Sequence, residues 1–362
     1  MGRVRRRDRG TVSPRALEFL IPGDLQTGTG GYVYDRRIIG GLRALDWTIT
    51  VHALDASFPH PTVSALDHAH AVLASLPDQA LVMIDGLALA AMPRVVRSHS
   101  ARLALVGLIH MPLGAERGWQ AGAARRLKQS EFQALRATRH VVVTSRSCRE
   151  ILLVSGIAPE RVSVVEPGTD AAPLATRFGD PVRLLCVATV NAGKGHELLI
   201  DALAPLAPLR WHLTCVGSLT RSPKTVSRLR AQLQRTGLAE RVTLVGEVKA
   251  DEVARFYLGA DLFVLPTRFE SYGMAVAEAV ACGLPVISTR TGAIPELVGA
   301  KSGLLVDPDV ASLREALQRV LSDPVLRASL ARGAAIARGT LPRWPAACTR
   351  MAEILEDVRS SA

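Results

Sequence analysis

The stretch Arg268-Phe-Glu-Ser-Tyr-Gly-Met-Ala-Val-Ala-Glu278 follows the apolar run 262–266 and places two carboxylates around the start of a helix. Residues 272–282 are mostly Ala, Met, Val and Cys, so we expect a helix that is buried on nearly every face. Glu278 is the only charged residue in it. A buried carboxylate without a partner is costly, so Glu278 is predicted to accept a hydrogen bond.

The start of this helix also suits an anion. Backbone N–H groups near Gly273 and Met274 lie at the positive end of the helix dipole, where a phosphate binds favourably. Two interpretations follow for this stretch. It forms either a pocket for a nucleotide sugar or a structural helix whose Glu278 pairs with a nearby arginine.

Length and composition bound the class of protein. The chain has 362 residues, which suits two domains, and its 48% hydrophobic and 21% charged residues are typical of a soluble globular protein. No apolar run reaches the roughly 18 residues of a transmembrane helix, and no apolar segment of a signal peptide follows the first basic residues. The five cysteines lack CxxC spacing, which favours free thiols in a reducing cytoplasm.

Positive charge is concentrated near the start of the chain. Of the net charge of +11, residues 1–15 contribute six Arg and one Asp, which is +5 and leaves +6 for the remainder. Residues 1–16 show no apolar periodicity and are predicted to be a disordered basic leader. No nucleic-acid recognition motif accompanies it and only 4% of residues are aromatic, so no nucleic-acid partner is predicted.

Beyond the leader, short apolar runs alternate with amphipathic stretches, which is typical of an α/β fold with parallel sheets covered by helices. Twelve runs are predicted to be strands: 17–21, 47–52, 80–84, 103–109, 140–144, 162–165, 184–189, 211–216, 242–245, 262–265, 285–288 and 302–306. Helices are predicted between them, among them 32–45, 63–75, 126–137, 147–155, 195–206, 226–236, 251–258 and 310–321.

The two series of runs predict two Rossmann-like domains. Ligands would bind at the carboxyl ends of the strands, in a cleft that both domains face. The expected boundaries are 17–172 for the first domain and 173–343 for the second. An amphipathic helix within 344–362 is expected to cross back toward the first domain.

Two features fall at strand ends of the first domain. Gly28-Thr-Gly-Gly-Tyr32 joins the first strand to the first helix, and its glycines either bring backbone N–H groups close to a ligand or serve a tight turn. His110 follows the strand 103–109, so its imidazole is expected at the carboxyl end of that strand, in a structural or a catalytic role.

In the second domain, Asn191-Ala-Gly-Lys-Gly-His196 joins the first strand to its helix. Lys194 in this loop is either a point charge for a diphosphate or a solvated lysine in a glycine turn. The loop lacks the GxxxxGK[ST] spacing of a Walker A motif, so ATP hydrolysis is not predicted.

The sequence shows none of the usual metal-binding motifs. HExxH and EF-hand patterns are missing. Asp307-Pro-Asp309 has the spacing of a DxD motif, but its position after an apolar run favours a role at the start of a helix. We therefore predict no metal cofactor.

Together these motifs resemble the retaining glycosyltransferases of family 4, which have the GT-B fold of two Rossmann-like domains facing each other across a cleft. The most specific part is the E-x7-E pair Glu270 and Glu278, followed by Gly292-Ala-Ile-Pro-Glu296 and Gly303-Leu-Leu-Val-Asp-Pro308. The glycine loop 28–32, His110 and Lys194 fall in the order of the family's glycine loop, active-site histidine and phosphate-binding lysine.

The resemblance implies roles for these residues. Glu278 would bind the ribose and Glu270 the sugar of a nucleoside diphosphate sugar, while Lys194 and backbone N–H groups would neutralise the diphosphate in place of a metal. The glycine loop would close over the phosphates, and His110 would contact the transferred sugar near its anomeric carbon. Residues expected to be catalytic are His110, Glu270 and Lys194. Residues expected to bind the donor are Gly30, Gly31, Thr189, Lys194, Arg268, Glu270, Ser271, Tyr272, Gly273, Met274 and Glu278.

One departure from the family concerns the diphosphate. The family usually has Gly-Arg-Leu before the lysine loop, whereas this chain has Ala188-Thr-Val190, so Thr189 offers a hydrogen bond but no charge. Loss of a charge-assisted contact weakens binding by about 1.5–3 kcal/mol unless another base such as Arg268 substitutes. The departure predicts weak activity or an atypical donor.

The predicted function is a cytoplasmic, metal-independent, retaining glycosyltransferase that moves a hexose from a UDP- or GDP-sugar to an acceptor. Two alternatives stay open: a nucleotide-sugar epimerase or hydrolase, and a catalytically silent module that binds sugar nucleotides. The acceptor could be a glycan, a lipid or a small metabolite. Arg94, Arg97, Arg125 and Arg126 could bring the protein to the inner face of the membrane or merely solvate a helix face.

Overall fold

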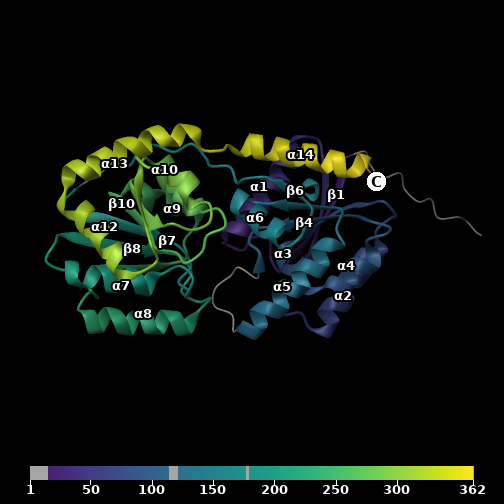
Figure 1. Ribbon diagram of the computed structural model, residues 1–362, viewed down its shortest axis with the longest axis horizontal. Coiled ribbons are helices and arrows are strands. Elements are labelled where there is room, and N and C mark those ends of the chain that lie inside the picture. Colours follow the sequence, from purple (N-terminus) through teal and green to yellow (C-terminus); the bar gives the residue numbers. More distant parts are fainter. Residues whose placement is uncertain (1–14, 114–120, 177–178, 362) are drawn as a thin grey trace, which may run out of the picture. The chain divides into compact units, whose positions relative to one another are not determined.

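The chain was studied as a computed structural model that describes residues 15–113, 121–176 and 179–361, and these residues form two compact units (Figure 1). Unit 1 contains the described residues up to Glu166 and, in addition, residues 344–361. Unit 2 contains the described residues from Pro167 to Arg343. Residues 1–14 of the predicted basic leader lie outside the described part of the chain.

Unit 1 is built on a parallel sheet whose described strands have the order β2-β1-β3-β4-β5-β6. Strands β3 and β4 are buried along their whole length, because helices cover the sheet. The strands are β1 (Ala16–Pro22), β2 (Thr48–Leu54), β3 (Leu81–Asp85), β4 (Ala104–Ile109), β5 (His140–Val143) and β6 (Val162–Val164). The helices are α1 (Gly30–Ala44), α2 (Val63–Ser75), α3 (Gly86–Ala91), α4 (Pro93–His99), α5 (Ala121–Arg136), α6 (Arg146–Val154), the 3-10 helix η2 (Pro159–Arg161) and α14 (Trp344–Ser360).

Unit 2 is built on a second parallel sheet, with the described strands in the order β12-β11-β10-β7-β8-β9. The strands are β7 (Val182–Val187), β8 (Trp211–Val216), β9 (Val242–Gly246), β10 (Leu262–Leu265), β11 (Val286–Thr289) and β12 (Gly303–Val306). The helices are α7 (His196–Leu203), α8 (Pro223–Thr236), α9 (Ala250–Leu258), α10 (Met274–Ala281), α11 (Ile294–Val298), α12 (Val310–Ser322), α13 (Pro324–Ala337) and the 3-10 helices η3 (Ala204–Leu206) and η4 (Arg338–Thr340).

Each sheet contains one point where the strand order reverses. In unit 1 the reversal lies between β1 and β3, and in unit 2 between β7 and β10, which pair directly. Connections from the two strands at such a point leave toward opposite sides, so their loops open a crevice at the carboxyl ends of the strands. The fold therefore places the loops after β1 and β3, and those after β7 and β10, in positions suited to binding.

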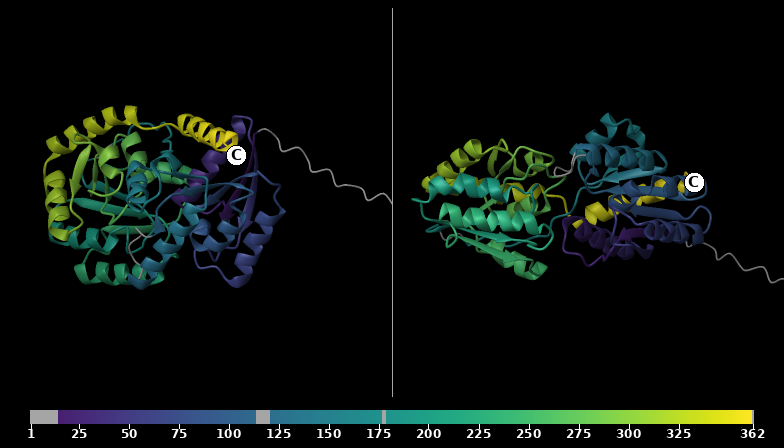
Figure 2. Two further views of the ribbon diagram at one scale, coloured as in Figure 1. Left: turned by 45° about the vertical axis from the view of Figure 1, so that its right-hand side comes forward. Right: turned by 90° about the horizontal axis from the view of Figure 1, so that it is seen from below.

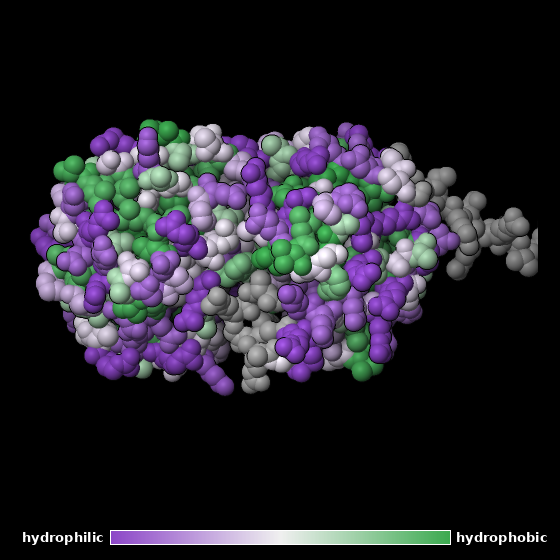
Figure 3. Space-filling view, in the orientation of Figure 1, coloured by the Kyte–Doolittle hydropathy of each residue, from purple (hydrophilic) through white to green (hydrophobic). Residues whose placement is uncertain are grey.

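Covering helices attach through narrow apolar stripes, and α8 shows the pattern. Its buried apolar residues Val226, Leu229 and Leu233 recur at the three- and four-residue spacing of one helix face. Its outer surface, at the lower left of Figure 3, is lined with hydrophilic residues. In the described part of the chain, no helix has the combination of length and apolar composition that a membrane span requires.

Helix α14 returns to unit 1 and packs on α1 (Figures 1 and 2). The Trp344 ring lies edge-on to Tyr34 at 6.0 Å between ring centroids. The approach is closest at Gly41, where an added Cβ would lie 2.0 Å from the Sγ of Cys348. A glycine at this position therefore lets the two helices meet.

The predicted α/β fold is confirmed, and each of the twelve predicted strands is observed with its ends within two residues of the predicted ones. Helices α3, α4 and α13 were not among the predicted elements. Helix α3 is buried at Gly86, Ala88, Leu89 and Ala90, so it has no polar face and no amphipathic pattern in the sequence. The five cysteines are free and buried, as expected.

Two neighbouring glycines of α1 test the contact with α14. Gly41→Ala forces a methyl group against Cys348, and such overpacking typically costs about 1–3 kcal/mol. Gly40 is exposed with no atom within 4 Å of an added Cβ, so Gly40→Ala should instead stabilise the helix by about 0.5–1 kcal/mol. Urea unfolding of both variants measures the difference. Equal effects would show that α14 does not pack on α1 in solution.

Candidate active site

In unit 2, the loop that carries Lys194 is joined to the loop after β10. The side chain of Asn191 shapes the first loop, because its Oδ1 accepts hydrogen bonds from the N of Gly193 at 3.0 Å and of Lys194 at 3.1 Å. The carbonyl of Gly193 then accepts from the N of Arg268 at 2.8 Å and from the Oγ1 of Thr267 at 3.1 Å. These bonds hold the two loops together at the point where the strand order reverses.

Gly195 makes this close approach possible. Its φ of +75° is in the left-handed region, and an added Cβ would lie 2.0 Å from the carbonyl oxygen of Pro266. Only glycine fits such a position without moving the backbone. The sequence element Lys194-Gly195 is therefore explained by packing at this point, whatever ligand the loop binds.

The two loops bring Lys194 and Glu270 into an ion pair. The Nζ of Lys194 lies 2.5 Å from the Oε2 of Glu270, and the two side chains are 27% and 15% exposed. An ammonium group and a carboxylate in contact, both open to one side, offer a ligand both a positive charge and an acceptor for hydroxyl groups. The structure thus brings together two predicted site residues that are 76 positions apart.

Helix α10 begins beside this pair. Gly273 precedes it with a φ of +98°. A Cβ added at Gly273 would lie 3.3 Å from the Cγ of Glu270. No acidic residue lies in the first turn, so the positive end of the helix dipole is not neutralised there by its own side chains. Ser271 and Met274 are half-buried and Tyr272 is buried.

Gly292 supports the backbone of this site from β11. Its φ is +52°, and an added Cβ would lie 1.5 Å from the carbonyl oxygen of Glu270. The turn after β11 therefore packs directly on the Glu270 backbone. This contact explains the glycine that the sequence shows just after the strand.

Glu278 has a hydrogen-bonding partner, as predicted, and the partner identified here is a tyrosine. The hydroxyl of Tyr257 in α9 lies 2.9 Å from the Oε2 of Glu278 and 3.0 Å from the carbonyl of Ala275. Burial, and then the charge of Glu278, hold the pKa of Tyr257 well above its usual range, so the hydroxyl stays a neutral donor. The sequence predicted a buried carboxylate, but Glu278 is half-buried. Its side chain is therefore partly accessible to a ligand.

Thr189 occupies the position at which the resemblance predicts an arginine, and Arg268 is the base predicted to take over its charge. Thr189 lies just beyond β7 and is half-buried. Arg268 is exposed, and its backbone rather than its side chain holds it to Gly193. That Arg268 substitutes for the missing charge stays a prediction. Asp309 caps α12 by accepting from the N of Ser312 at 2.9 Å, which confirms its predicted role at a helix start.

In unit 1, the glycine loop and His110 are in contact. Gly30 and Gly31 form the first turn of α1, after Thr29, whose side chain makes no cap hydrogen bond. An added Cβ at Gly31 would lie 3.2 Å from the Cδ2 of His110, which is tighter than an ordinary contact. A glycine at this position therefore lets the imidazole lie against the start of α1.

Two carboxylates that the sequence analysis did not identify hold His110. Its Nε2 lies 2.9 Å from the Oδ1 of Asp35 and 3.3 Å from the Oδ2 of Asp85. Burial alone would lower the pKa of His110, but the charges and hydrogen bonds of the two carboxylates outweigh it and raise the pKa to about 10. Burial raises the pKa of Asp35 to about 6, although His110 opposes the shift.

Sequence signals for both carboxylates exist. Asp35 follows Gly31 by four residues, so it lies on the same face of α1 as the glycine turn. Asp85 is the last residue of β3, whose neighbour β4 ends just before His110.

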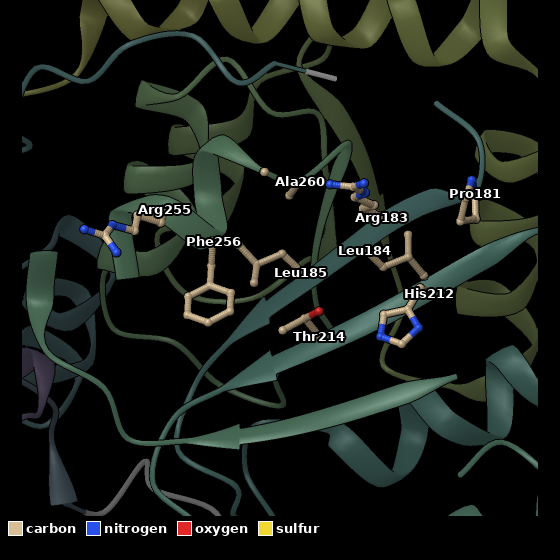
Figure 4. A pocket seen from close by; sticks show the side chains of 10 residues that line it. Pro181, Arg183, Leu184, Leu185, His212, Thr214, Arg255, Phe256 and Ala260 are labelled. Carbon is tan, nitrogen blue, oxygen red and sulfur yellow. The ribbon is translucent and has the colours of Figure 1, made fainter. Parts of the chain in front are cut away.

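An open hollow of about 450 Å³ lies elsewhere in unit 2, against β7, β8 and α9 (Figure 4). Arg183 and His212 from the strands and Arg255 and Phe256 from the helix line it. None of its lining residues is a predicted site residue, and it lies beside the first part of the strands rather than at their carboxyl ends. It is therefore separate from the candidate site.

Comparisons with known proteins agree with this geometry. Residues 181–323 match the family model described as glycosyl transferases group 1. The D-inositol 3-phosphate glycosyltransferase of Acidothermus cellulolyticus is 34% identical over 218 residues, which are 55% of this chain and 48% of that protein. That of Thermomonospora curvata is 30% identical over 247 residues, 60% of this chain and 56% of that protein. The chain thus spans about half the length of these curated relatives.

Solved structures show the same fold along nearly the whole chain. Sucrose-phosphate synthase from Thermosynechococcus elongatus superposes with a TM-score of 0.81 at 21% identity, covering 96% of this chain and 100% of that one. HepE of Anabaena, in complex with UDP-glucose, superposes with a TM-score of 0.73 at 21% identity, with the same coverage of 96% and 100%. The chain therefore has the GT-B fold, and its residues 181–323 match the model of the glycosyl transferases group 1 family.

Proposed function

We propose that the chain is a retaining glycosyltransferase that moves a hexose from a UDP- or GDP-sugar to an acceptor hydroxyl. The observation that carries the proposal is the pair of Lys194 and Glu270 at the start of α10, 2.5 Å apart, where the strand order of the sheet reverses. A nucleoside diphosphate sugar has a diphosphate next to a ring of hydroxyl groups. It can use the ammonium group and the carboxylate at once.

The proposed binding mode assigns each part of the donor to one structural feature. Lys194 and the N–H groups at the start of α10 hold the diphosphate, because positive charge and the helix dipole both favour an anion there. Glu270 accepts hydrogen bonds from the sugar. Glu278, one turn further along α10 than Met274, accepts from the ribose and is held by Tyr257.

The proposed reaction breaks the bond between the anomeric carbon and the diphosphate oxygen. The acceptor oxygen forms its bond to that carbon on the same face, and its proton passes to the departing phosphate oxygen. The new negative charge on the diphosphate is stabilised by Lys194 and by the start of α10, which are oriented before the reaction begins. On this proposal no protein nucleophile and no metal ion take part.

Relatives suggest which substrates to try first. The curated relatives are named D-inositol 3-phosphate glycosyltransferases, and HepE was solved with UDP and with UDP-glucose. We propose UDP-glucose as the first donor and D-inositol 3-phosphate as the first acceptor for assays. GDP-mannose serves as the comparison for the nucleobase.

The assay that tests the function uses the purified full chain with each donor, with and without acceptor, in excess EDTA. We expect nucleoside diphosphate release that depends on the acceptor, and a product with the anomeric configuration of the donor by NMR. Conversion of the donor without acceptor would instead support an epimerase or hydrolase. Binding without turnover would support a silent binding module, and a requirement for added Mn²⁺ would contradict the metal-independent mechanism.

Removal of the Glu278 carboxylate should weaken binding of the nucleotide itself. A hydrogen bond to a charged group contributes about 1.5–3 kcal/mol, so Glu278→Gln should raise the Kd for UDP by about 10- to 100-fold. Tyr257→Phe keeps the carboxylate but removes its partner, so a smaller rise is expected. Calorimetric titration with UDP measures both. Unchanged UDP affinity in Glu278→Gln would contradict the assignment of this residue to the nucleotide.

Lys194 and Glu270 should affect different parts of the donor. Glu270→Gln frees the lysine from its ion pair, so UDP should bind as well as before or more tightly, while the additional affinity for UDP-glucose over UDP is lost. Lys194→Met should lower kcat by about 100- to 1000-fold, as loss of one group that stabilises a leaving anion does. Lys224→Met, on the exposed part of α8, is the control. A Glu270→Gln variant that keeps the preference for UDP-glucose would refute the assignment of Glu270 to the sugar and Lys194 to the diphosphate.

A further inference from the structure

The imidazole of His110 is held by two buried carboxylates on the side away from solvent. Its Nε2 contacts Asp35 of α1 at 2.9 Å and Asp85 at the end of β3 at 3.3 Å. The side chains of the two aspartates are 1% and 4% exposed, whereas that of His110 is 20% exposed. The histidine is therefore the accessible end of a three-residue cluster whose other members are inside unit 1.

This arrangement determines how each ring nitrogen is used. Ionised carboxylates only accept hydrogen bonds, so Nε2 must carry a proton between them. Asp85 is itself fixed, because its Oδ1 accepts from the N of Leu87 at 2.8 Å and caps α3. Nδ1 is then the ring nitrogen that remains for a ligand.

Charge compensation decides the protonation of Nδ1. Two buried carboxylates without a counter-charge would be strongly destabilised, and an imidazolium supplies one. The raised pKa of His110, about 10, agrees with a charged ring in which both nitrogens carry protons. Tyr34 lies edge-on to His110 at 5.3 Å between ring centroids, and burial keeps its pKa well above the usual range, so it stays neutral. The charge of Arg36 lowers the pKa of Asp35 and so also favours the ionised carboxylate, but less than His110 does.

The backbone of His110 is fixed as well. The Oγ1 of Thr144, just beyond β5, donates to the carbonyl of His110 at 2.9 Å. A Cβ added at Gly31 would lie only 3.2 Å from the His110 ring, so the start of α1 packs closely against the imidazole. The residue is thus held by groups from α1, from β3 and from the end of β5. These contacts fix the orientation of the imidazole, as a group that must point at a ligand requires.

We propose that Asp35 is a positioning residue which, together with Asp85, keeps His110 as a hydrogen-bond donor through Nδ1–H. His110 then donates to an oxygen of the transferred sugar and cannot take the proton of the acceptor, because it has no free lone pair. The proposal rests on the proposed glycosyltransfer for the identity of the ligand. The state of His110 itself is independent of that function and can be measured separately.

The first test follows the nine histidines by NMR in ¹⁵N-labelled protein without substrate, with His110→Gln to assign the signal. We expect His110 to stay doubly protonated through pH 9 in the wild type. In Asp35→Asn its pKa should fall by more than one unit. Asp85→Asn should also lower it while preserving the fold, because asparagine still caps α3.

A matched control is available in the same unit. Glu18→Gln removes another histidine–carboxylate pair, that of Glu18 and His52 at 2.6 Å, and should leave the titration of His110 unchanged. A wild-type His110 that titrates near pH 6.5 overturns the proposal. So does a His110 whose titration is the same in both aspartate variants.

The second test compares pH profiles of turnover in the wild type, Asp35→Asn and Asp35→Glu. Because the raised pKa keeps His110 charged, wild-type kcat should not fall with rising pH until that pKa is approached. In Asp35→Asn kcat should fall about tenfold by one pH unit above the lower His110 pKa that the NMR titration gives, with little change in the KM for donor, and Asp35→Glu should restore part of the loss. A uniform loss at every pH would reduce Asp35 to a structural role and overturn the proposal, as would Mn²⁺ activation that Asp35→Asn abolishes.

The two tests separate the two proposals. A shifted His110 pKa in a protein that transfers no sugar would refute the proposed function and keep the role of Asp35 as the residue that holds His110 protonated. Sugar transfer by a protein whose His110 titration does not respond to Asp35 would keep the function and refute that role.

Discussion

The contact between the loops after β7 and β10 is the constraint on which the unit 2 site depends. Gly195 lies so close to Pro266 that an added Cβ would be 2.0 Å from its carbonyl oxygen, and the carbonyl of Gly193 is bonded by Thr267 and Arg268. This contact is possible only because β7 and β10 are neighbours in the sheet. It aligns Lys194 with Glu270 before any ligand arrives, and such preorganisation lowers the cost of binding a charged, flexible ligand.

Polar groups in both units are arranged in pairs. In unit 2 the ammonium group of Lys194 contacts Glu270, and the hydroxyl of Tyr257 contacts Glu278. In unit 1 the imidazole of His110 contacts two aspartates. Since buried charges are stable only when compensated, these pairs allow each unit to hold ionisable groups beside its own apolar core. A ligand that displaces the Lys194–Glu270 contact must replace it, which favours ligands that offer both anionic and hydroxyl groups.

Local sequence patterns predicted the strands well, because burial on both faces of a parallel sheet needs a continuous apolar run. The same rule works less well for helices that are buried all round. Helix α3 consists of Gly, Leu and Ala, and its buried faces leave no polar stripe to recognise. For Glu278 the pattern predicted a partner, but the candidates considered were a ligand and an arginine. A tyrosine 21 positions away in α9 is a partner that the pattern did not predict.

By itself the sequence determined the α/β class and the order of the motifs, because these depend on burial and backbone conformation within a few residues. Only the tertiary structure decided which of those motifs meet. Lys194 reaches Glu270 across 76 positions and His110 reaches Asp35 across 75, in each case at a reversal of strand order or next to one. Such contacts depend on which strands become neighbours, and strand order is a property of the packed sheet that no local pattern of residues encodes.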